Sequence, residues 1–140
     1  MEEFENYKVQ LKLPVQWGDM DAARHVNNVI YLRWMESCRI EYMKAISGQS
    51  TVNLIQVGPI LGWQDCKYIF PMTFPDTALI GVKTEEVKED RLILEGRIFS
   101  DSKERLCAIS RQTVIAYDYE KLVKAPIPKK WLENIEAHGF

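Results

Sequence analysis

Residues 29–46 form the segment that most restricts how this chain can fold. Apolar side chains recur there at spacings of three and four: Tyr31, Met35, Cys38, Tyr42 and Ala45. That period is typical of an α-helix. Twelve of the eighteen residues are apolar, which is more than the stripe of a helix on a protein surface. Asn27 or Asn28 is suited to cap the helix and Gly48 to end it. We expect one long helix that is covered on most of its sides.

Much of the remaining chain shows the pattern of β-strands. From Tyr7 to Trp17 apolar and polar residues alternate, which predicts a strand with one buried face. Pro14 places that strand at a sheet edge or a bulge. After a loop around residues 49–53, further strands are expected at residues 60–70, 78–88, 91–100 and 106–119. Proline favours a short helix over residues 128–137.

This order of elements leaves few ways to bury the long helix. An antiparallel sheet of about five strands that wraps around the helix would bury it, and this α+β arrangement is the hotdog fold. The chain has 140 residues, which fits one domain, and no repeat or linker divides it. We expect a single domain over residues 1–140.

Composition limits the partners and the compartment. The formal net charge of −2 argues against nucleic-acid binding, which needs a dominant basic surface. No segment approaches the roughly 20 apolar residues of a membrane span, and residues 1–7 lack the apolar core of a signal peptide. The three cysteines form no CxxC pair and indicate neither disulfides nor zinc. We expect a cytoplasmic protein that binds neither nucleic acid nor membrane.

The polar loop before the long helix carries groups suited to chemistry. Within ten residues it holds Asp19, Asp21, His25, Asn27 and Asn28. The first N–H groups of a helix lack partners within it and carry partial positive charge, so they can stabilise the oxyanion of an attacked carbonyl. A carboxylate opposite them can attack that carbonyl or take a proton from water. These groups suffice for acyl transfer to water.

The segment from Trp17 to Asn28 resembles the signature of the 4-hydroxybenzoyl-CoA thioesterase family, and the likeness continues into the helix through Tyr31, Glu36 and Arg39. Weaker similarities lie at residues 68–71, 74–76, 114–118 and 126–128, so the likeness spans nearly the whole chain. The resemblance implies the hotdog fold, a homodimer or homotetramer with active sites between subunits, and no metal or organic cofactor.

The resemblance also implies roles for residues of the loop. Asp21 matches the family's catalytic aspartate, which acts as nucleophile or general base, and the amide that polarises the thioester carbonyl falls near Asn28. Asn27 and His25 are expected to position the loop or the substrate, and Asp19 to be structural. The predicted function is hydrolysis of an acyl-CoA to a free acid and CoA.

One position departs from the family pattern. Many relatives have glycine two residues before Val26, where this chain has Arg24. Glycine adopts a positive φ without cost, whereas arginine does not. Either the loop has a different local conformation, or Arg24 contacts a phosphate of CoA or a carbonyl of its pantetheine arm.

Other functions stay open on the sequence. The substrate can be an acyl group on a carrier protein in place of CoA. The chain can also bind acyl thioesters without hydrolysing them. A hydratase or dehydratase of the same fold fits less well, because those enzymes surround their histidine with a different pattern from that around His25.

Overall fold

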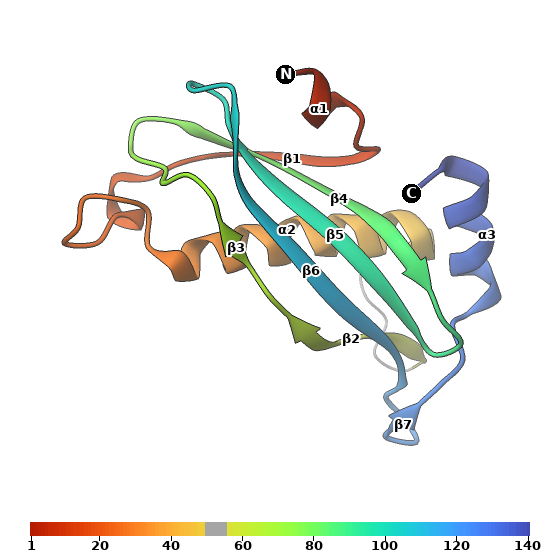
Figure 1. Cartoon of the computed structure of the whole chain (residues 1–140). Helices are drawn as coiled ribbons and strands as arrows, with labels where there is room; N and C mark the ends of the chain where they lie inside the picture. The colour runs from red at the N-terminus through yellow and green to blue at the C-terminus, as the bar shows by residue number, and fades with distance from the viewer. Residues whose placement is uncertain (50–55) are drawn as a thin grey trace.

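The computed structural model describes residues 1–49 and 56–140, in which a curled antiparallel sheet lies across one long helix (Figure 1). The elements follow in the order α1 (Glu2–Glu5), β1 (Val9–Pro14), η1 (Trp17–Asp19), α2 (Asn28–Ser47), β2 (Val57–Gln64), β3 (Lys67–Tyr68), β4 (Thr77–Val87), β5 (Arg91–Ser100), β6 (Arg105–Asp118), β7 (Val123–Lys124) and α3 (Lys129–His138). The expected α+β hotdog arrangement is confirmed. None of the described helices is long and apolar enough to cross a membrane.

The sheet has the strand order β1-β4-β5-β6-β2, and β3 and β7 also pair with β6. Every pairing is antiparallel, as expected. β1 lies at one edge and ends at Pro14, which pairs with Thr77. The expected edge position of this proline is therefore confirmed.

Helix α2 begins and ends where the sequence predicts. The side chain of Asn27 accepts a hydrogen bond from Val29 N (3.0 Å), and Gly48 ends the helix in the left-handed conformation at φ 69°. The face of α2 that packs on the sheet carries Tyr31, Trp34, Met35, Cys38, Tyr42, Met43 and Ile46. The opposite flank is open, because Val29 and Ile40 are 59% and 42% exposed. The expectation that α2 is covered on most sides is therefore wrong within one chain.

Several boundaries differ from the sequence-based prediction. The single strand expected over residues 60–70 is two strands, since β2 begins at Val57 and the pairing with β6 shifts between Leu61 and Trp63. Asp65 and Cys66 interrupt it before β3. The short α1 and β7 have too few residues to show a period. Most of the loop expected at residues 49–53 lies outside the described residues.

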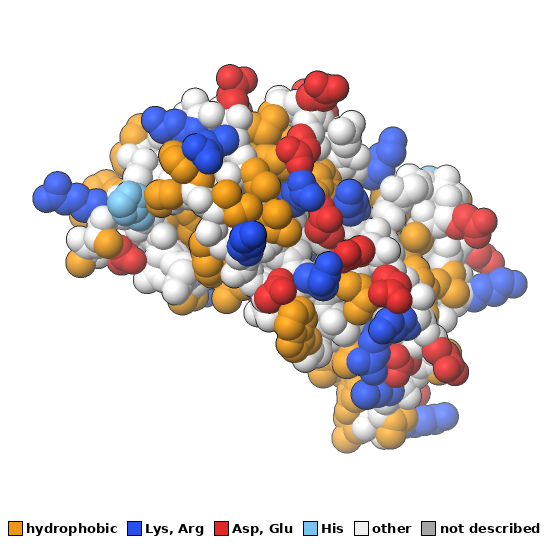
Figure 2. All heavy atoms as spheres, in the orientation of Figure 1, with side chains coloured by type: hydrophobic (Ala, Val, Ile, Leu, Met, Phe, Trp, Pro, Cys, Tyr) orange, Lys and Arg blue, Asp and Glu red, His pale blue; other side chains and the backbone are white. Residues whose placement is uncertain are grey.

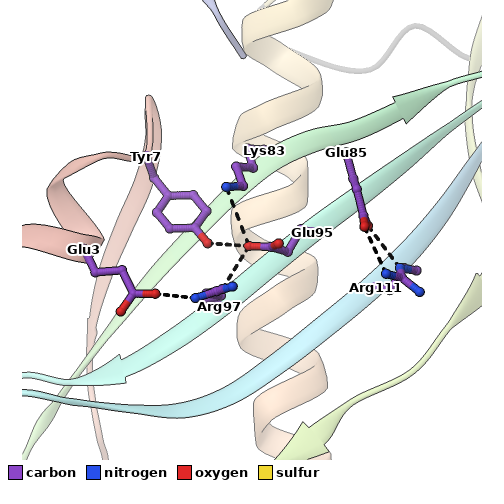
Figure 3. A network of polar contacts seen from close by, with 7 residues as sticks. All are labelled: Glu3, Tyr7, Lys83, Glu85, Glu95, Arg97 and Arg111. Carbon is purple, nitrogen blue, oxygen red and sulfur yellow. Dashed lines mark hydrogen bonds and ion pairs between the residues drawn. The ribbon is translucent and has the colours of Figure 1, made fainter.

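The N-terminal segment docks on the convex face of the sheet, away from α2. Phe4 packs edge-on against Phe99 at 6.2 Å between ring centroids, and the ring of Tyr7 lies over Gly81. Figure 3 shows the Tyr7 hydroxyl donating to Glu95 (2.7 Å), which also pairs with Arg97 (2.9 Å). Burial, followed by this carboxylate, raises the pKa of Tyr7. The rest of this face mixes charged and apolar side chains (Figure 2).

Candidate active site

The loop between η1 and α2 is a narrow hairpin anchored at both ends. Met20 and Val26 form an isolated antiparallel bridge, and Val26 N donates to Met72 O (2.9 Å). Asn27 N donates to Asp19 O (2.9 Å), while the Asp19 carboxylate accepts from Gln16 N (2.8 Å). Asp19 therefore holds the backbone of the loop, as expected for a structural residue.

Asp21 lies at the start of the hairpin turn. Its N–H donates to His25 O and its carbonyl accepts from Arg24 N, both at 3.0 Å. Its Oδ1 accepts from Ala23 N at 2.8 Å. An aspartate that caps its own turn in this way is common in loops. No other hydrogen bond of the carboxylate occurs among residues 1–49 and 56–140, so Oδ2 is available to a ligand.

Arg24 adopts the backbone conformation that glycine would favour. Its φ is 63°, in the left-handed region. The loop thus keeps the geometry that glycine allows, and the first explanation offered by the sequence, a different local conformation, is wrong. A non-glycine residue there costs roughly 1–2 kcal/mol.

We expect Arg24→Gly to be more stable than Arg24→Ala, although both lose the guanidinium. Glycine relieves the positive φ, whereas alanine keeps the strain. Glycine also increases the entropy of the unfolded chain, which offsets part of this gain. The free energy of unfolding of Arg24→Gly should therefore exceed that of Arg24→Ala by about 0.5–1 kcal/mol. Urea unfolding of both variants measures it. Equal stability of the two would contradict the strained backbone.

The first turn of α2 leaves one backbone amide available. Val29 N donates to the Asn27 side chain (3.0 Å) and Ile30 N to the Asn27 carbonyl (2.9 Å). Asn28 N donates no hydrogen bond in the part of the chain that the structure describes. The hydroxyl of Tyr68 donates to Asn28 O (2.9 Å), which holds the next peptide, Asn28–Val29, from the β3 side. The free amide carries the positive end of the helix dipole.

A cavity of about 480 Å³ opens at this helix end. Asp21, Asn27 and Asn28 line one side of it. Tyr31 and Tyr68 line the other, with their rings edge to face at 5.2 Å between centroids. The structure thus brings Asp21 of the loop and the first residues of the helix to one cavity.

A second cavity of about 380 Å³ lies against Asp21, and Arg24 also lines it. Its other walls include Trp17, Phe74 and Thr73. Trp17 is 73% exposed, so it is not part of the buried core of the single chain. Thr73 was not foreseen, because it reaches the loop only through tertiary folding.

The side chain of His25 is exposed and is not among the residues that line either cavity. Its contact with Asp21 is made by its backbone carbonyl. The structure therefore does not bring its ring together with Asp21 and Asn28 at the cavity.

The three cysteines are poorly suited to act as nucleophiles. Burial raises the pKa of the Cys38 thiol to about 12 and that of Cys107 to about 11, and it also raises the pKa of Cys66. The thiolate is the reactive form, and these shifts disfavour it. No cluster of three or more His, Cys, Asp or Glu side chains suited to a metal ion occurs among the described residues.

Comparison with known proteins places these features in a family. The sequence matches the profile of the thioesterase-like superfamily over residues 15–135. No curated protein matches it significantly.

Solved structures share the fold at low identity. A thioesterase superfamily protein from a Jannaschia species is 20% identical with a TM-score of 0.86, over 99% of this chain and 89% of that one. A thioesterase complexed with coenzyme A and Zn from Thermus thermophilus is 22% identical with a TM-score of 0.79, over 95% of both chains. The gentisyl-coenzyme A thioesterase BH1999 is 23% identical with a TM-score of 0.78, over 89% of this chain and 98% of that one.

The matched residues include the Asp21 loop, all of α2 and the main strands from β2 to β7. The fold of the similar structures agrees with the sheet wrapped across α2. The chain therefore belongs to the thioesterase-like superfamily, the family of thioester hydrolases that its sequence led us to expect.

Proposed function

We propose that this protein hydrolyses acyl-CoA thioesters to a free carboxylic acid and CoA. The observation that carries the proposal is the single cavity shared by the Asp21 carboxylate and the start of α2. An acyl carbonyl placed there accepts a hydrogen bond from the Asn28 N–H. That donor is preorganised, so it stabilises negative charge on the oxygen in the transition state.

Asp21 supplies the other half of the reaction. As a general base, its Oδ2 takes a proton from water, the hydroxide adds to the thioester carbon, and the intermediate expels CoA thiolate, which receives the proton. As a nucleophile, the carboxylate adds to the thioester carbon and the C–S bond breaks, so that CoA leaves as a thiolate, which takes a proton from solvent. Water then opens the mixed anhydride to the free acid and the Asp21 carboxylate. In both routes Oδ1 stays bonded to Ala23 N, which holds the carboxylate in place. Neither route requires a cofactor.

Asp21 lines both cavities, and this suggests how the substrate lies. The acyl group occupies the cavity beside α2, and the pantetheine arm leaves across Asp21 toward Arg24. There the guanidinium meets a phosphate of CoA, an anion that arginine binds well. Asn27 holds the start of the helix, and His25 holds the loop through its carbonyl.

We further propose a homodimer or homotetramer. β2 is an edge strand of the sheet and exposes Ile60, Leu61 and Trp63 by 39%, 37% and 53%. An apolar edge of this kind favours pairing with another strand. Free thiols at all three cysteines fit a reducing compartment such as the cytoplasm.

Release of free thiol tests the function. Short, medium, long and aromatic acyl-CoAs, with an acylated carrier protein alongside, are expected to include at least one substrate with steady turnover. Preferential turnover of the carrier-protein thioester would change the substrate class but not the reaction. Tight acyl-CoA binding without thiol release at any chain length would identify a binding protein and contradict the proposal.

A further inference from the structure

A third cavity, of about 200 Å³, lies farther along α2. Its walls are mainly apolar and come from three elements, with Ile40 on α2, Leu61 on β2 and Val114 on β6. Glu36 and Arg39 are its charged residues. A guanidinium in an apolar pocket is unusual, because burial of a charge is costly unless a partner compensates it.

This cavity lies in line with the first one, along the side of α2 that faces β2 and β3. The first cavity is bounded by Tyr31 on α2 and Tyr68 on β3, and the third by Glu36 on α2 and Leu61 on β2. Asn28 in the first cavity and Arg39 in the third are eleven residues apart, or about 16.5 Å along the helix axis, and they lie on nearly the same side of the helix. An acyl chain whose carbonyl lies at Asn28 N and that follows α2 therefore needs about ten carbons to reach the guanidinium of Arg39.

Arg39 is held in the third cavity by a neutral group. Its guanidinium donates to Gln112 Oε1 (2.6 Å), and Gln112 is completely buried. No carboxylate within the described ranges forms an ion pair with Arg39. Burial lowers the pKa of this guanidinium, and nearby Glu36 opposes that effect. Arginine has five N–H donors, so most of those on Arg39 are left for another acceptor.

Buried polar atoms gather behind Arg39. Gln112 Nε2, Ser110 Oγ and Gln64 Oε1 are the buried side-chain atoms without a partner in the described part of the chain. Gln64 lies opposite Gln112 in the β2–β6 pairing, and Ser110 lies two residues from Gln112 on the same strand. Unpartnered buried polar atoms are costly and are uncommon without a function. Pairing between the two glutamines would satisfy two of these atoms and still leave Arg39 without an ion-pair partner.

We infer that Arg39, positioned by Gln112, selects acyl groups that carry an oxygen acceptor at the end remote from the thioester. The shared chemistry is an acceptor oxygen, either a carboxylate or a hydroxyl. The inference rests on the proposed hydrolysis of acyl thioesters, because the acyl chain must start at Asn28.

Three acyl-CoAs of equal chain length test this inference: decanoyl-CoA, 10-hydroxydecanoyl-CoA and the CoA monothioester of decanedioic acid. Wild type is expected to show a kcat/KM about 10-fold or more higher for at least one oxygenated substrate than for decanoyl-CoA. Arg39→Met should remove this preference. Arg33→Met is the matched control, since it removes an exposed arginine of the same helix.

Gln112→Glu provides a second test that keeps the guanidinium. The new carboxylate has nearly the same shape and pairs with Arg39 internally, so the preference should fall and thermal stability should not. If Arg39→Met does not fold, this variant decides the question. An unchanged preference in Gln112→Glu would overturn the inference.

Binding to Asp21→Asn separates this inference from the proposed function. Calorimetry should give a dissociation constant about 10-fold lower for the favoured oxygenated acyl-CoA than for decanoyl-CoA, and Arg39→Met should abolish the difference. If this difference in affinity is found but wild type releases no thiol, the proposed hydrolysis is contradicted and the selectivity of Arg39 is retained. Equal affinities of the three ligands for Asp21→Asn would overturn the inference. If Arg39→Met instead weakens binding of all three ligands equally and the subunits dissociate, the inference is also overturned, and Arg39 is assigned to a contact between chains.

Discussion

Asp21→Asn is expected to lower kcat/KM for acyl-CoA hydrolysis by about 10²–10⁴-fold. Asparagine can neither attack the thioester nor accept a proton from water at neutral pH. Its Oδ1 still accepts the hydrogen bond from Ala23 N that closes the turn, so the fold and the melting temperature should not change. Steady-state thiol release and a thermal melt measure the two quantities.

Asp19→Asn is the matched control for this change. It makes the same substitution two residues earlier, in a carboxylate that accepts from Gln16 N. Asparagine retains that bond as well, so this variant should keep nearly all of the activity. Full activity of Asp21→Asn, or equal losses in the two variants, would remove Asp21 from the catalytic role.

Met35→Ala should produce the largest loss of stability. Met35 is completely buried between α2 and the sheet, and its sulfur packs against Gly96 on β5. Removing its side chain leaves a cavity and lowers the free energy of unfolding by about 3 kcal/mol. For a chain of 140 residues this lowers Tm by roughly 10 °C. Urea unfolding gives the free energy directly.

Gly96→Ala tests the same contact from the other side. A methyl group at Gly96 would lie 2.6 Å from the Met35 sulfur, so the single variant should be overpacked and lose about 1–3 kcal/mol. In the Met35→Ala background the methyl fills vacated space and should cost less, with a coupling of about 1 kcal/mol. Strictly additive losses would show that the two residues do not share this space.

The sequence predicts the elements whose signals are local. The period of α2, its Asn27 cap and its Gly48 end are all encoded in neighbouring residues, and β5 occupies residues 91–100 as predicted. The break between β2 and β3 depends on pairing with β6, and α1 depends on a pocket formed by Leu79 and Phe99. Those partners lie far away in the chain, so no local pattern indicates them.

The sequence likewise predicts some residues of the candidate site and misses others. The motif places Asp21 and Asn28 together, and the structure brings them to one cavity. The walls supplied by Tyr68 and Phe74 form because residues 68–74 fold back against the loop, which composition and spacing do not reveal. The exposure of Ile40 likewise depends on which elements of the chain pack against α2, and the local sequence does not indicate this.

The structure of Asp21→Asn with a bound acyl-CoA tests the central claim most directly. The account predicts that the thioester carbonyl oxygen lies within about 2.7–3.2 Å of Asn28 N. The acyl group should then follow α2, and the CoA phosphates should lie on the Arg24 side of the loop. A thioester bound away from Asn28 N, or reversed so that CoA follows α2, would contradict the account.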